Sequence, residues 1–404
     1  MKTNAPIKQF LFFRRLPPHP KGEWGGLEKL MFDWFERIDH AQTDVVVIVT
    51  TGWKERFLQE ARQRGLPLKV EEQPFDYFHV GPLRRFFDML KFLNGYRPFG
   101  IVFFQAHFEE FGLPELIAAS WAAKGNIFMH ENTGSLKPPA CTSRKYFGFI
   151  PGLGLWWQYY MFCIRFRAHV AKNILAVSQG IKDRYVSWWG YPDHKVIISY
   201  HGVDTGNFLP DTSIRTKMRQ QLNFSEQDKI LIAVARLTPL KRIDRAIRAF
   251  NILYQNNPDA HLVLVGAGPL EGECRQLAGS LPCAAHIHFI GHVNNTVDYL
   301  RMADIFVLSS DNEGFSIALM EAMGCGLIVV ATDCPGCNEI ILEGQTGFIT
   351  SFSDESFAEG LSKAMGLSGQ RQSAMKQLAV HTIAERFDIN NNVRHLLKTI
   401  GMGP

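Results

Sequence analysis

Short apolar runs alternate with longer, helix-like patterns along the whole chain. The runs that predict strands lie at 10–13, 45–50, 101–104, 126–129 and 174–178 in the first half, and at 230–235, 261–266, 287–291, 305–309 and 327–332 in the second. They are rich in Val, Ile and Leu without alternating polar residues, which is typical of strands buried on both faces of a parallel sheet. Two successive sets of strand–helix units therefore predict two α/β domains with doubly wound parallel sheets.

The length of the chain supports this division. A chain of 404 residues is too long for one ordinary core, so two domains of roughly 200 residues are expected. The join is expected in the Gly-, Asp- and Pro-rich segment 201–213. We therefore predict a first domain over 1–205, a second over 206–382, and a C-terminal helix over 383–404 that returns to the first.

The composition is that of a soluble globular protein, with 46% apolar and 20% charged residues. The net charge of +4 is uneven: residues 1–204 hold 26 Lys and Arg against 19 Asp and Glu, a net of +7, and residues 205–404 hold 17 against 20, a net of −3. The asymmetry reflects either two ordinary solvated surfaces or a first half adapted to an anionic lipid or substrate. Basic and aromatic residues are not interleaved as single-stranded nucleic acid would require, so no nucleic-acid partner is expected.

The N-terminal apolar run and the cysteines bear on location. The run at 10–13 is too short for a signal-peptide core and is ended by Arg14 and Arg15. Seven Cys is an odd number, and no export signal accompanies them. These features predict reduced thiols and a cytoplasmic location.

One uncharged stretch, 146–164, lies between basic residues. Its length suggests a membrane span, but three Gly and one Pro in its first half leave about ten residues of continuous helix, too few to cross a bilayer. Two interpretations remain: a buried domain helix, or an aromatic surface that brings the protein to the inner face of a membrane as a peripheral contact.

Polar residues and glycine turns follow the predicted strands of the second half. Arg236 comes directly after the run at 230–235, Lys241 follows five residues later, Gly268 lies in the Gly-Ala-Gly-Pro turn after the next run, and Val293 follows the third. Because the carboxyl ends of parallel strands meet at one edge of a sheet, these loops are expected to converge. Taken singly, the two cations would be ordinary surface residues, and the glycine turn lacks the spacing of a dinucleotide fingerprint.

The run at 305–309 leads into EGFSIALME, which places Glu313 in a turn and Glu321 in the following helix. Cations and helix N-terminal amides bind phosphate. A carboxylate accepts two hydrogen bonds at once, as a sugar diol offers them. The combination fits a nucleotide sugar better than a bare phosphate or a metal ion.

The order of these residues between 230 and 350 resembles the donor half of retaining GT-B glycosyltransferases of family 4, including their E-x7-E pattern. GEWGGLEKL at 22–30 resembles the family's N-terminal glycine loop, and 176–186 and 199–210 resemble the segments that connect its two domains. The resemblance implies the GT-B fold, in which two Rossmann-like domains face each other across a cleft. It also implies that the first domain recognises the acceptor and the second binds the donor.

By position, the resemblance implies that Arg236 and Lys241 bind the donor diphosphate, that Glu313 binds the transferred sugar, and that Glu321 binds the ribose. The remaining donor contacts that it implies are Gly25 and Gly26 in the first domain, Gly268, the backbone near Val293, Gly314, and the helix-start amides of Phe315, Ser316 and Ile317.

Two histidines follow strands in the first half. His130 matches the family's histidine that approaches the sugar and diphosphate, and it joins Arg236, Lys241 and Glu313 as an implied catalytic residue. His107 matches a less constant position. For both, a structural role is the alternative. The sequence His-Glu-Asn-Thr-Gly departs from the family's usual His-Asp or His-Thr, which leaves acceptor recognition open.

The family retains the anomeric configuration and needs no divalent metal, so neither a metal site nor a cofactor is expected. Catalysis would rest on positioning and on stabilising the leaving phosphate, which takes the acceptor proton. Glu313 as a covalent nucleophile is the less favoured alternative.

The segment Cys334–Cys337 has the C-x-x-C spacing of redox and metal sites. It follows a buried strand where the family has a Gly-rich turn, and no second C-x-x-C completes a zinc site. The sequence therefore favours a structural role for both cysteines.

Together, the resemblance implies a retaining transferase that moves a hexose or N-acetylhexosamine from a nucleoside diphosphate sugar, UDP-linked by family frequency. The basic first half and the 146–164 stretch suggest a cell-envelope glycan or a lipid-linked saccharide as acceptor. Two alternatives remain, a small-molecule glycosyltransferase and a catalytically silent subunit that binds a sugar nucleotide. The presence of Arg236, Lys241, Glu313 and Glu321 argues against the silent subunit.

Overall fold

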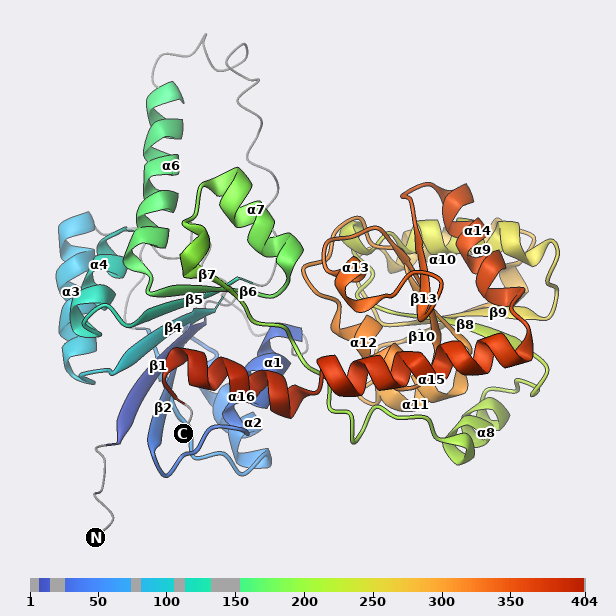
Figure 1. Ribbon diagram of the computed structural model, residues 1–404, viewed down its shortest axis with the longest axis horizontal. Helices are drawn as coiled ribbons and strands as arrows, with labels where there is room; N and C mark the ends of the chain where they lie inside the picture. The colour runs from blue at the N-terminus through green and yellow to red at the C-terminus, as the bar shows by residue number, and fades with distance from the viewer. Residues whose placement is uncertain (1–6, 15–25, 74–80, 105–112, 132–152, 403–404) are drawn as a thin grey trace. The chain divides into compact units, whose positions relative to one another are not determined.

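The computed structural model describes residues 7–14, 26–73, 81–104, 113–131 and 153–402 (Figure 1). The chain divides into two compact units, one made of Met1–Tyr200 with Asn392–Pro404 and the other of His201–Asn391. The sequence analysis placed these boundaries after residues 205 and 382. The second boundary lies later because the long helix that ends at Arg386 packs on a helix of the second unit.

The first unit contains a seven-stranded parallel sheet with the order β3-β2-β1-β4-β5-β6-β7. Its strands are β1 (Lys8–Arg14), β2 (Thr43–Val49), β3 (Lys69–Glu72), β4 (Gly100–Phe104), β5 (Ile127–Glu131), β6 (Asn173–Ala176) and β7 (Val196–Ile198). Strand β1 is central, and its Phe12 lies opposite Val47 on one neighbour and Val102 on the other. Phe12 is fully buried, as the continuous apolar run predicts.

Helices cover both faces of this sheet (Figure 1). They are α1 (Gly26–Phe35), α2 (Lys54–Gln63), α3 (Pro82–Asn94), α4 (Leu113–Ala122), α6 (Leu153–Val170), α7 (Gln179–Trp189) and the part of α16 (Ile389–Ile400) from residue 392 onward. Local sequence fixes some ends: the Ser178 hydroxyl accepts a hydrogen bond from the Ile181 amide at the start of α7, and Gly190, with φ of 69°, ends that helix.

The second unit contains a six-stranded parallel sheet with the order β10-β9-β8-β11-β12-β13. Its strands are β8 (Lys229–Val234), β9 (Ala260–Val265), β10 (Ile287–Gly291), β11 (Ile305–Leu308), β12 (Ile328–Thr332) and β13 (Gly347–Thr350). Its helices are α8 (Thr212–Gln221), α9 (Ile243–Tyr254), α10 (Glu271–Gly279), α11 (Thr296–Met302), α12 (Ile317–Gly324), α13 (Cys337–Ile340), α14 (Asp354–Met365) and α15 (Gly369–Arg386). Helices α9, α10 and α14 lie on one face, and α8, α11, α12 and α15 on the other (Figure 1).

In both sheets the chain runs outward from a central strand and then returns to the other side of it. The reversal falls between β1 and β4 in the first unit and between β8 and β11 in the second. This is the topology of a doubly wound sheet, in which ligands bind beyond the carboxyl ends of the strands that flank the reversal. The predicted fold class, two Rossmann-like doubly wound domains, is confirmed.

Three strands escaped the sequence analysis, namely β3, β7 and β13. Each lies at the edge of its sheet, and each is only three or four residues long. Edge strands bury less surface than central ones, so their sequences need not be apolar; β3 reads Lys-Val-Glu-Glu. The apolar-run criterion misses these short edge strands, although it finds the longer β10 at the other edge of the second sheet.

The uncharged stretch 146–164 lies partly outside the described residues. From Leu153 onward it forms α6, which continues through the basic residues as far as Val170. Near its middle Phe162 is 57% exposed while Cys163 is fully buried, so this helix has both a packed and an open side. None of the helices in the described part of the chain is long and apolar enough to cross a membrane.

Candidate functional site

The reversal in the second sheet brings two predicted site loops together. Strands β8 and β11 are neighbours, with Ile305 opposite Leu231, so the loops that follow them leave the same edge of the sheet. The two loops are joined by a backbone hydrogen bond in which Asp311 N–H donates to the Leu240 carbonyl at 2.9 Å. The sequence expectation that these loops converge agrees with this geometry.

An ion pair between Lys241 and Glu313 lies at the centre of this edge. Lys241 Nζ is 2.6 Å from Glu313 Oε1, and the side chains are 26% and 11% exposed. The Ser310 hydroxyl donates a second hydrogen bond to the same carboxylate oxygen at 2.7 Å. Two residues that the resemblance assigns to different parts of one ligand, its diphosphate and its sugar, therefore contact each other directly.

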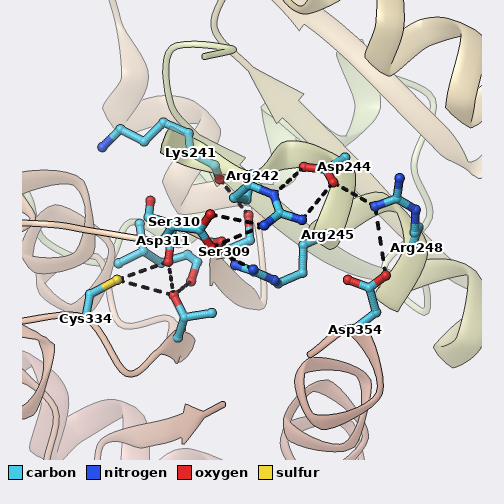
Figure 2. Close-up of polar contacts among 12 residues, drawn as sticks. Lys241, Arg242, Asp244, Arg245, Arg248, Ser309, Ser310, Asp311, Cys334 and Asp354 are labelled. Atoms are coloured by element: carbon cyan, nitrogen blue, oxygen red, sulfur yellow. Dashed lines mark hydrogen bonds and ion pairs between the residues drawn. The ribbon is translucent and has the colours of Figure 1, made fainter. Parts of the chain in front are cut away.

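Buried hydrogen bonds hold the loop that carries Glu313. The Ser310 carbonyl accepts from the Thr332 hydroxyl at 2.5 Å and from the Cys334 thiol at 3.0 Å (Figure 2). The Ser309 hydroxyl donates to the Lys241 carbonyl at 3.0 Å, which ties the same loop to the one after β8. The loops that carry Lys241 and Glu313 are thus held together by buried hydrogen bonds.

A group of arginines and aspartates beside this pair was missed by the sequence analysis. Arg245 is 2% exposed and donates to the Ser309 carbonyl at 2.6 Å and to Asp311 at 2.7 Å. Arg242 bridges Asp244 and Asp311, each at 3.0 Å (Figure 2). These hydrogen bonds, those to Asp244 first, raise the pKa of Arg242 above its usual value. No spacing signal reveals the group, because Asp311, which joins Arg242 to Arg245, comes from a separate loop.

Arg242 also has an unusual backbone. Its φ of 47° and ψ of 47° lie in the left-handed region, between the turn Pro239–Lys241 and helix α9. A residue with a side chain reaches this conformation at some energetic cost, and such conformations gather at functional sites. Here the two aspartates that bind the guanidinium stabilise the turn directly after Lys241.

Helix α12 begins at the predicted helix-start residues. The Ser316 hydroxyl caps it by accepting from the Leu319 amide at 3.4 Å. Phe315 and Ser316 are both 5% exposed, and the Phe315 ring contacts His201 and Phe387. These side chains therefore anchor the helix start, which agrees with a ligand role through their backbone amides rather than their side chains.

The remaining predicted donor residues of the second unit are spread around the same edge. Gly314 is buried, Ile317 is the first residue of α12, and Glu321 lies half-buried in that helix. Gly336 approaches so closely that a Cβ on it would lie 2.5 Å from the Gly314 carbonyl oxygen. Val293 is half-buried in the loop between β10 and α11.

Arg236 and Gly268 are also placed by the structure. Arg236 is exposed, and no ion pair links it to another residue in the part of the chain that the structure describes. Gly268 packs against the same loop so tightly that a Cβ on it would collide with the Leu237 backbone. Packing alone therefore requires glycine at position 268, because the β9–α10 turn closely approaches the loop that carries Arg236.

The histidine of the first unit lies in a different environment. His130 is in β5 and fully buried, with its ring 5.0 Å from that of Trp34 and 5.2 Å from that of Phe104. The next residue, Glu131, binds Arg167 at 3.1 Å and the Tyr185 hydroxyl at 2.9 Å, and all three are buried. Sequence reasoning missed this buried cluster because its members are far apart along the chain.

Part of the predicted first-unit site lies outside the described residues, namely Gly25 and His107. Gly26 is the first residue of α1. At the end of β1, Arg14 Nη2 is 2.7 Å from Glu28 Oε1 in the first turn of that helix. Within the described ranges no three His, Cys, Asp or Glu side chains are arranged to hold a metal ion, and metal independence stays a prediction.

Comparison with known proteins matches almost the whole chain to glycosyltransferases. The family model described as Glycosyltransferase Family 4 matches residues 24–207, and that described as Glycosyl transferases group 1 matches 214–379. A GDP-mannose-dependent alpha-(1-6)-phosphatidylinositol monomannoside mannosyltransferase of Mycolicibacterium smegmatis is 30% identical over 220 residues, 52% of this chain and 56% of the relative. The putative glycosyltransferase EpsD of Bacillus subtilis is 31% identical over 199 residues, 46% of this chain and 52% of the relative.

The match thus spans about half the length of these relatives. Solved structures align over nearly the whole chain. Anabaena HepE in complex with UDP has a TM-score of 0.75 at 18% identity and covers 98% of this chain and 100% of its own. A glycosyltransferase from Rickettsia africae has a TM-score of 0.76 at 16% identity and covers 98% of both chains. At these low sequence identities, the structural matches support the fold alone.

Proposed function

Because the chain belongs to the GT-B glycosyltransferases of family 4, we propose that it transfers a glycosyl group from a nucleoside diphosphate sugar. The observation that carries this proposal is the half-exposed Lys241–Glu313 pair at the reversal of the second sheet. One cation and one carboxylate at this edge match a ligand with a diphosphate next to a sugar. The buried bonds beneath them keep both side chains in place before the ligand arrives.

In this proposal Lys241 and Arg236 bind the diphosphate and stabilise the charge that develops on the leaving phosphate. Glu313 accepts hydrogen bonds from sugar hydroxyls, and the amides at the start of α12 add donors for phosphate. Glu321 binds the ribose. Donor binding then inserts the ligand between Lys241 and Glu313, so that each side chain exchanges its partner for a part of the substrate.

We further propose that transfer retains the anomeric configuration, proceeds without a divalent metal, and uses the departing phosphate as base. The positive side chains, Lys241 and Arg236, supply the charge that a metal would otherwise provide. The family resemblance favours uridine as the base by frequency alone, while the mannosyltransferase relative named above depends on GDP-mannose. Both nucleotides therefore belong in the first experiment.

The acceptor part of the proposal is a cell-envelope glycan or a lipid-linked saccharide. The net charge of +7 over residues 1–204 supports an anionic or membrane-bound acceptor. The 57% exposure of Phe162 on α6 supports a peripheral membrane contact of the first unit. A silent sugar-nucleotide-binding subunit is the alternative, and donor turnover distinguishes the two.

The test is calorimetric titration with UDP, GDP and ADP in the absence of metal. Micromolar binding of one nucleotide is expected for the wild type, and Lys241→Ala should weaken it on the order of tenfold to a hundredfold, because a charge-assisted contact with phosphate is lost. Lys217→Ala, which removes an exposed lysine on α8, is the matched control and should bind normally.

Binding must then be joined by turnover. Donor hydrolysis or transfer with product of the same anomeric configuration, read by nuclear magnetic resonance, supports a retaining enzyme. Binding without any turnover across acceptors would favour the silent subunit. A folded protein that binds none of the three nucleotides would refute the donor site.

A further inference from the structure

The turn Cys334–Pro335–Gly336–Cys337 lies directly beneath the loop that carries Glu313. Its ends are joined by a hydrogen bond from the Cys337 amide to the Cys334 carbonyl at 3.0 Å. Gly336 has φ of 82° and ψ of −25°, which after a proline is the pattern of a type II turn. The sequence favoured a structural role for both cysteines, but this geometry places them in contact with the candidate site.

The turn brings the two thiols together. A β-turn holds its first and fourth Cα atoms within about 7 Å, a range that overlaps the roughly 4.4–6.8 Å that a disulfide requires. Both side chains are fully buried, and both belong to the same hydrogen-bonded turn. The turn therefore needs little rearrangement to accept a bond between the two sulfurs.

The two thiols differ in reactivity. Interaction with the neighbouring Cys337 thiol lowers the pKa of Cys334, while the same interaction and burial raise the pKa of Cys337. Burial raises the pKa of the Cys274 and Cys283 thiols as well, and that of Cys325 to about 12. Because the thiolate is the nucleophile, Cys334 is the favoured site of attack among these.

We propose that Cys334 and Cys337 form a reversible dithiol–disulfide site that reacts with small hydroperoxides and thereby controls the loop that carries Glu313. The Cys334 thiolate attacks the peroxide, whose O–O bond breaks, and gives a sulfenic acid and, with hydrogen peroxide, hydroxide. The Cys337 thiol then attacks the Cys334 sulfur, forming the disulfide and releasing water. In total, two thiols and one hydrogen peroxide give one disulfide and two waters.

The connection from the thiols to the site is short. The Cys334 thiol donates to the Ser310 carbonyl at 3.0 Å (Figure 2), and the Ser310 hydroxyl donates to Glu313 at 2.7 Å. Glu313 in turn binds Lys241 at 2.6 Å. Disulfide formation removes the thiol proton, so the first of these bonds is lost while the Thr332 bond to the same carbonyl remains. The loop is loosened but not released.

Access sets which oxidant can act. The flanking residues Asp333 and Asn338 are exposed and Pro335 is half-buried, while both cysteines are fully buried. The turn thus reaches the surface, but its sulfurs are covered by neighbouring atoms. A hydroperoxide of nearly the size of water can reach that depth more readily than a bulky disulfide reagent.

The first experiment measures the bond itself on the full chain. Protein is treated with hydrogen peroxide, alkylated, and cleaved before aspartates, which isolates residues 333–353 with these two cysteines and no others. The expected result is a loss of two hydrogens in this peptide, reversed by dithiothreitol. In Cys337→Ser the bond cannot form, and dimedone should trap a sulfenic acid on Cys334. Alkylation of both cysteines after peroxide treatment of the folded protein would overturn the proposal.

The second experiment measures the consequence for the loop. Hydrogen–deuterium exchange of residues 309–315 should become faster in the oxidised wild type and return to the reduced rate after dithiothreitol, whereas untreated Cys337→Ser, which keeps the Cys334 thiol, should exchange like the reduced wild type, with circular dichroism as the control for folding. If Cys337→Ser does not fold, Cys334→Ala and the dithiothreitol-reversed wild type take its place. Identical exchange in fully reduced and fully disulfide-bonded protein would refute the coupling.

The effect on donor binding rests on the proposed function, whereas formation of the bond does not. Oxidation should weaken nucleotide binding by about fivefold, the order expected for loss of one hydrogen bond. An unchanged Kd in disulfide-bonded protein would contradict control of the site. If the reduced protein binds no nucleotide, the proposed function fails, and the peptide mass and the exchange rates still decide the redox site.

Discussion

At the carboxyl edge of the second sheet, Lys241 and Glu313 form an ion pair whose side chains are 26% and 11% exposed. At the same edge of the first sheet, Arg167 and Glu131 form one whose side chains are 5% and 2% exposed. Tyr185 donates a further hydrogen bond to Glu131. The two sheets share one topology, but the first ion pair is partly exposed to water and the second is buried.

The difference decides what each pair can do. A half-exposed pair contributes little to stability, and a charged ligand can replace either partner at small cost. In a buried pair, a ligand cannot reach either partner to replace it. Removing one partner leaves a buried charge without compensation. The comparison therefore predicts that substitutions in the buried Arg167–Glu131 pair change folding, whereas those in the Lys241–Glu313 pair change ligand binding.

Removal of the buried partner should give the largest effect. Arg167→Met removes a cation that binds the buried Glu131 carboxylate, and the free energy of unfolding should fall by about 3–5 kcal/mol. Urea denaturation followed by tryptophan fluorescence measures this. The matched control is Arg165→Met, an exposed arginine two residues earlier in α6, which should stay within about 0.5 kcal/mol. A loss of less than 1 kcal/mol for Arg167→Met would break the comparison.

The second unit also contains one buried titratable group that should affect its folding. His201 is 2% exposed, and burial lowers its pKa to about 3. The unfolded chain takes up a proton near pH 6.5 and the folded chain does not, so stability is complete above pH 6.5 and falls as the pH decreases toward 3. Between pH 6.5 and 5 the loss should be about 2 kcal/mol.

Denaturation curves at a series of pH values test this, with His201→Gln as the comparison. Between about pH 6.5 and 4, the free energy of unfolding of the variant should depend less steeply on pH, by the slope that corresponds to one proton. The remaining pH dependence comes from other groups, including His261 and His288, whose pKa values burial also lowers. Equal slopes in the two proteins would show that His201 does not titrate on unfolding.

Replacement of Glu313 should separate binding from stability. Glu313→Gln removes the charge that pairs with Lys241, and kcat/KM for the donor should fall on the order of tenfold to a hundredfold. The free energy of unfolding should change by about 1 kcal/mol or less, because the pair is partly solvated. Glu271→Gln, which breaks the exposed pair with Arg275, is the control for charge and should leave turnover unchanged. A Glu313→Gln protein that unfolds easily but turns over normally would reverse the two roles.

Features that depend on neighbouring residues in the chain could be predicted from the sequence, whereas contacts between distant residues could not. Central strands such as β1 and β12 contain four consecutive apolar residues and were found. The short edge strands β3, β7 and β13 contain at most three in a row and were missed. In the site, Lys241 and Glu313 were found because a family pattern marks them.

The supporting contacts were not visible in the sequence. Arg245 reaches Asp311 across 66 residues of chain and Arg167 reaches Glu131 across 36. No periodicity links residues at such separations, and only the packing of neighbouring loops and strands brings them together. The burial of His130 likewise depends on Trp34 and Phe104, which lie on other elements.

The smallest expected effect concerns Asp311, which is 41% exposed and binds both Arg242 and Arg245. Burial raises its pKa, but the hydrogen bonds from these two arginines outweigh it, so the pKa lies below its usual value. The contribution of Asp311 is therefore present above about pH 4 and lost as the pH falls below it. Because the carboxylate is 41% exposed and an Asn oxygen can still accept from Arg245, Asp311→Asn should cost about 1 kcal/mol or less.

The effect of this variant on donor affinity shows what holds the loop in place. Arg245 still donates to the Ser309 carbonyl at 2.6 Å when Asp311 is replaced, so the backbone beneath Glu313 keeps its position. Donor affinity measured by calorimetry should fall by only about two- to threefold in Asp311→Asn, and by more in Arg245→Met, where the buried bond itself is lost. Equal losses in the two variants would mean that the exposed ion pairs, and not the buried hydrogen bond, position Glu313.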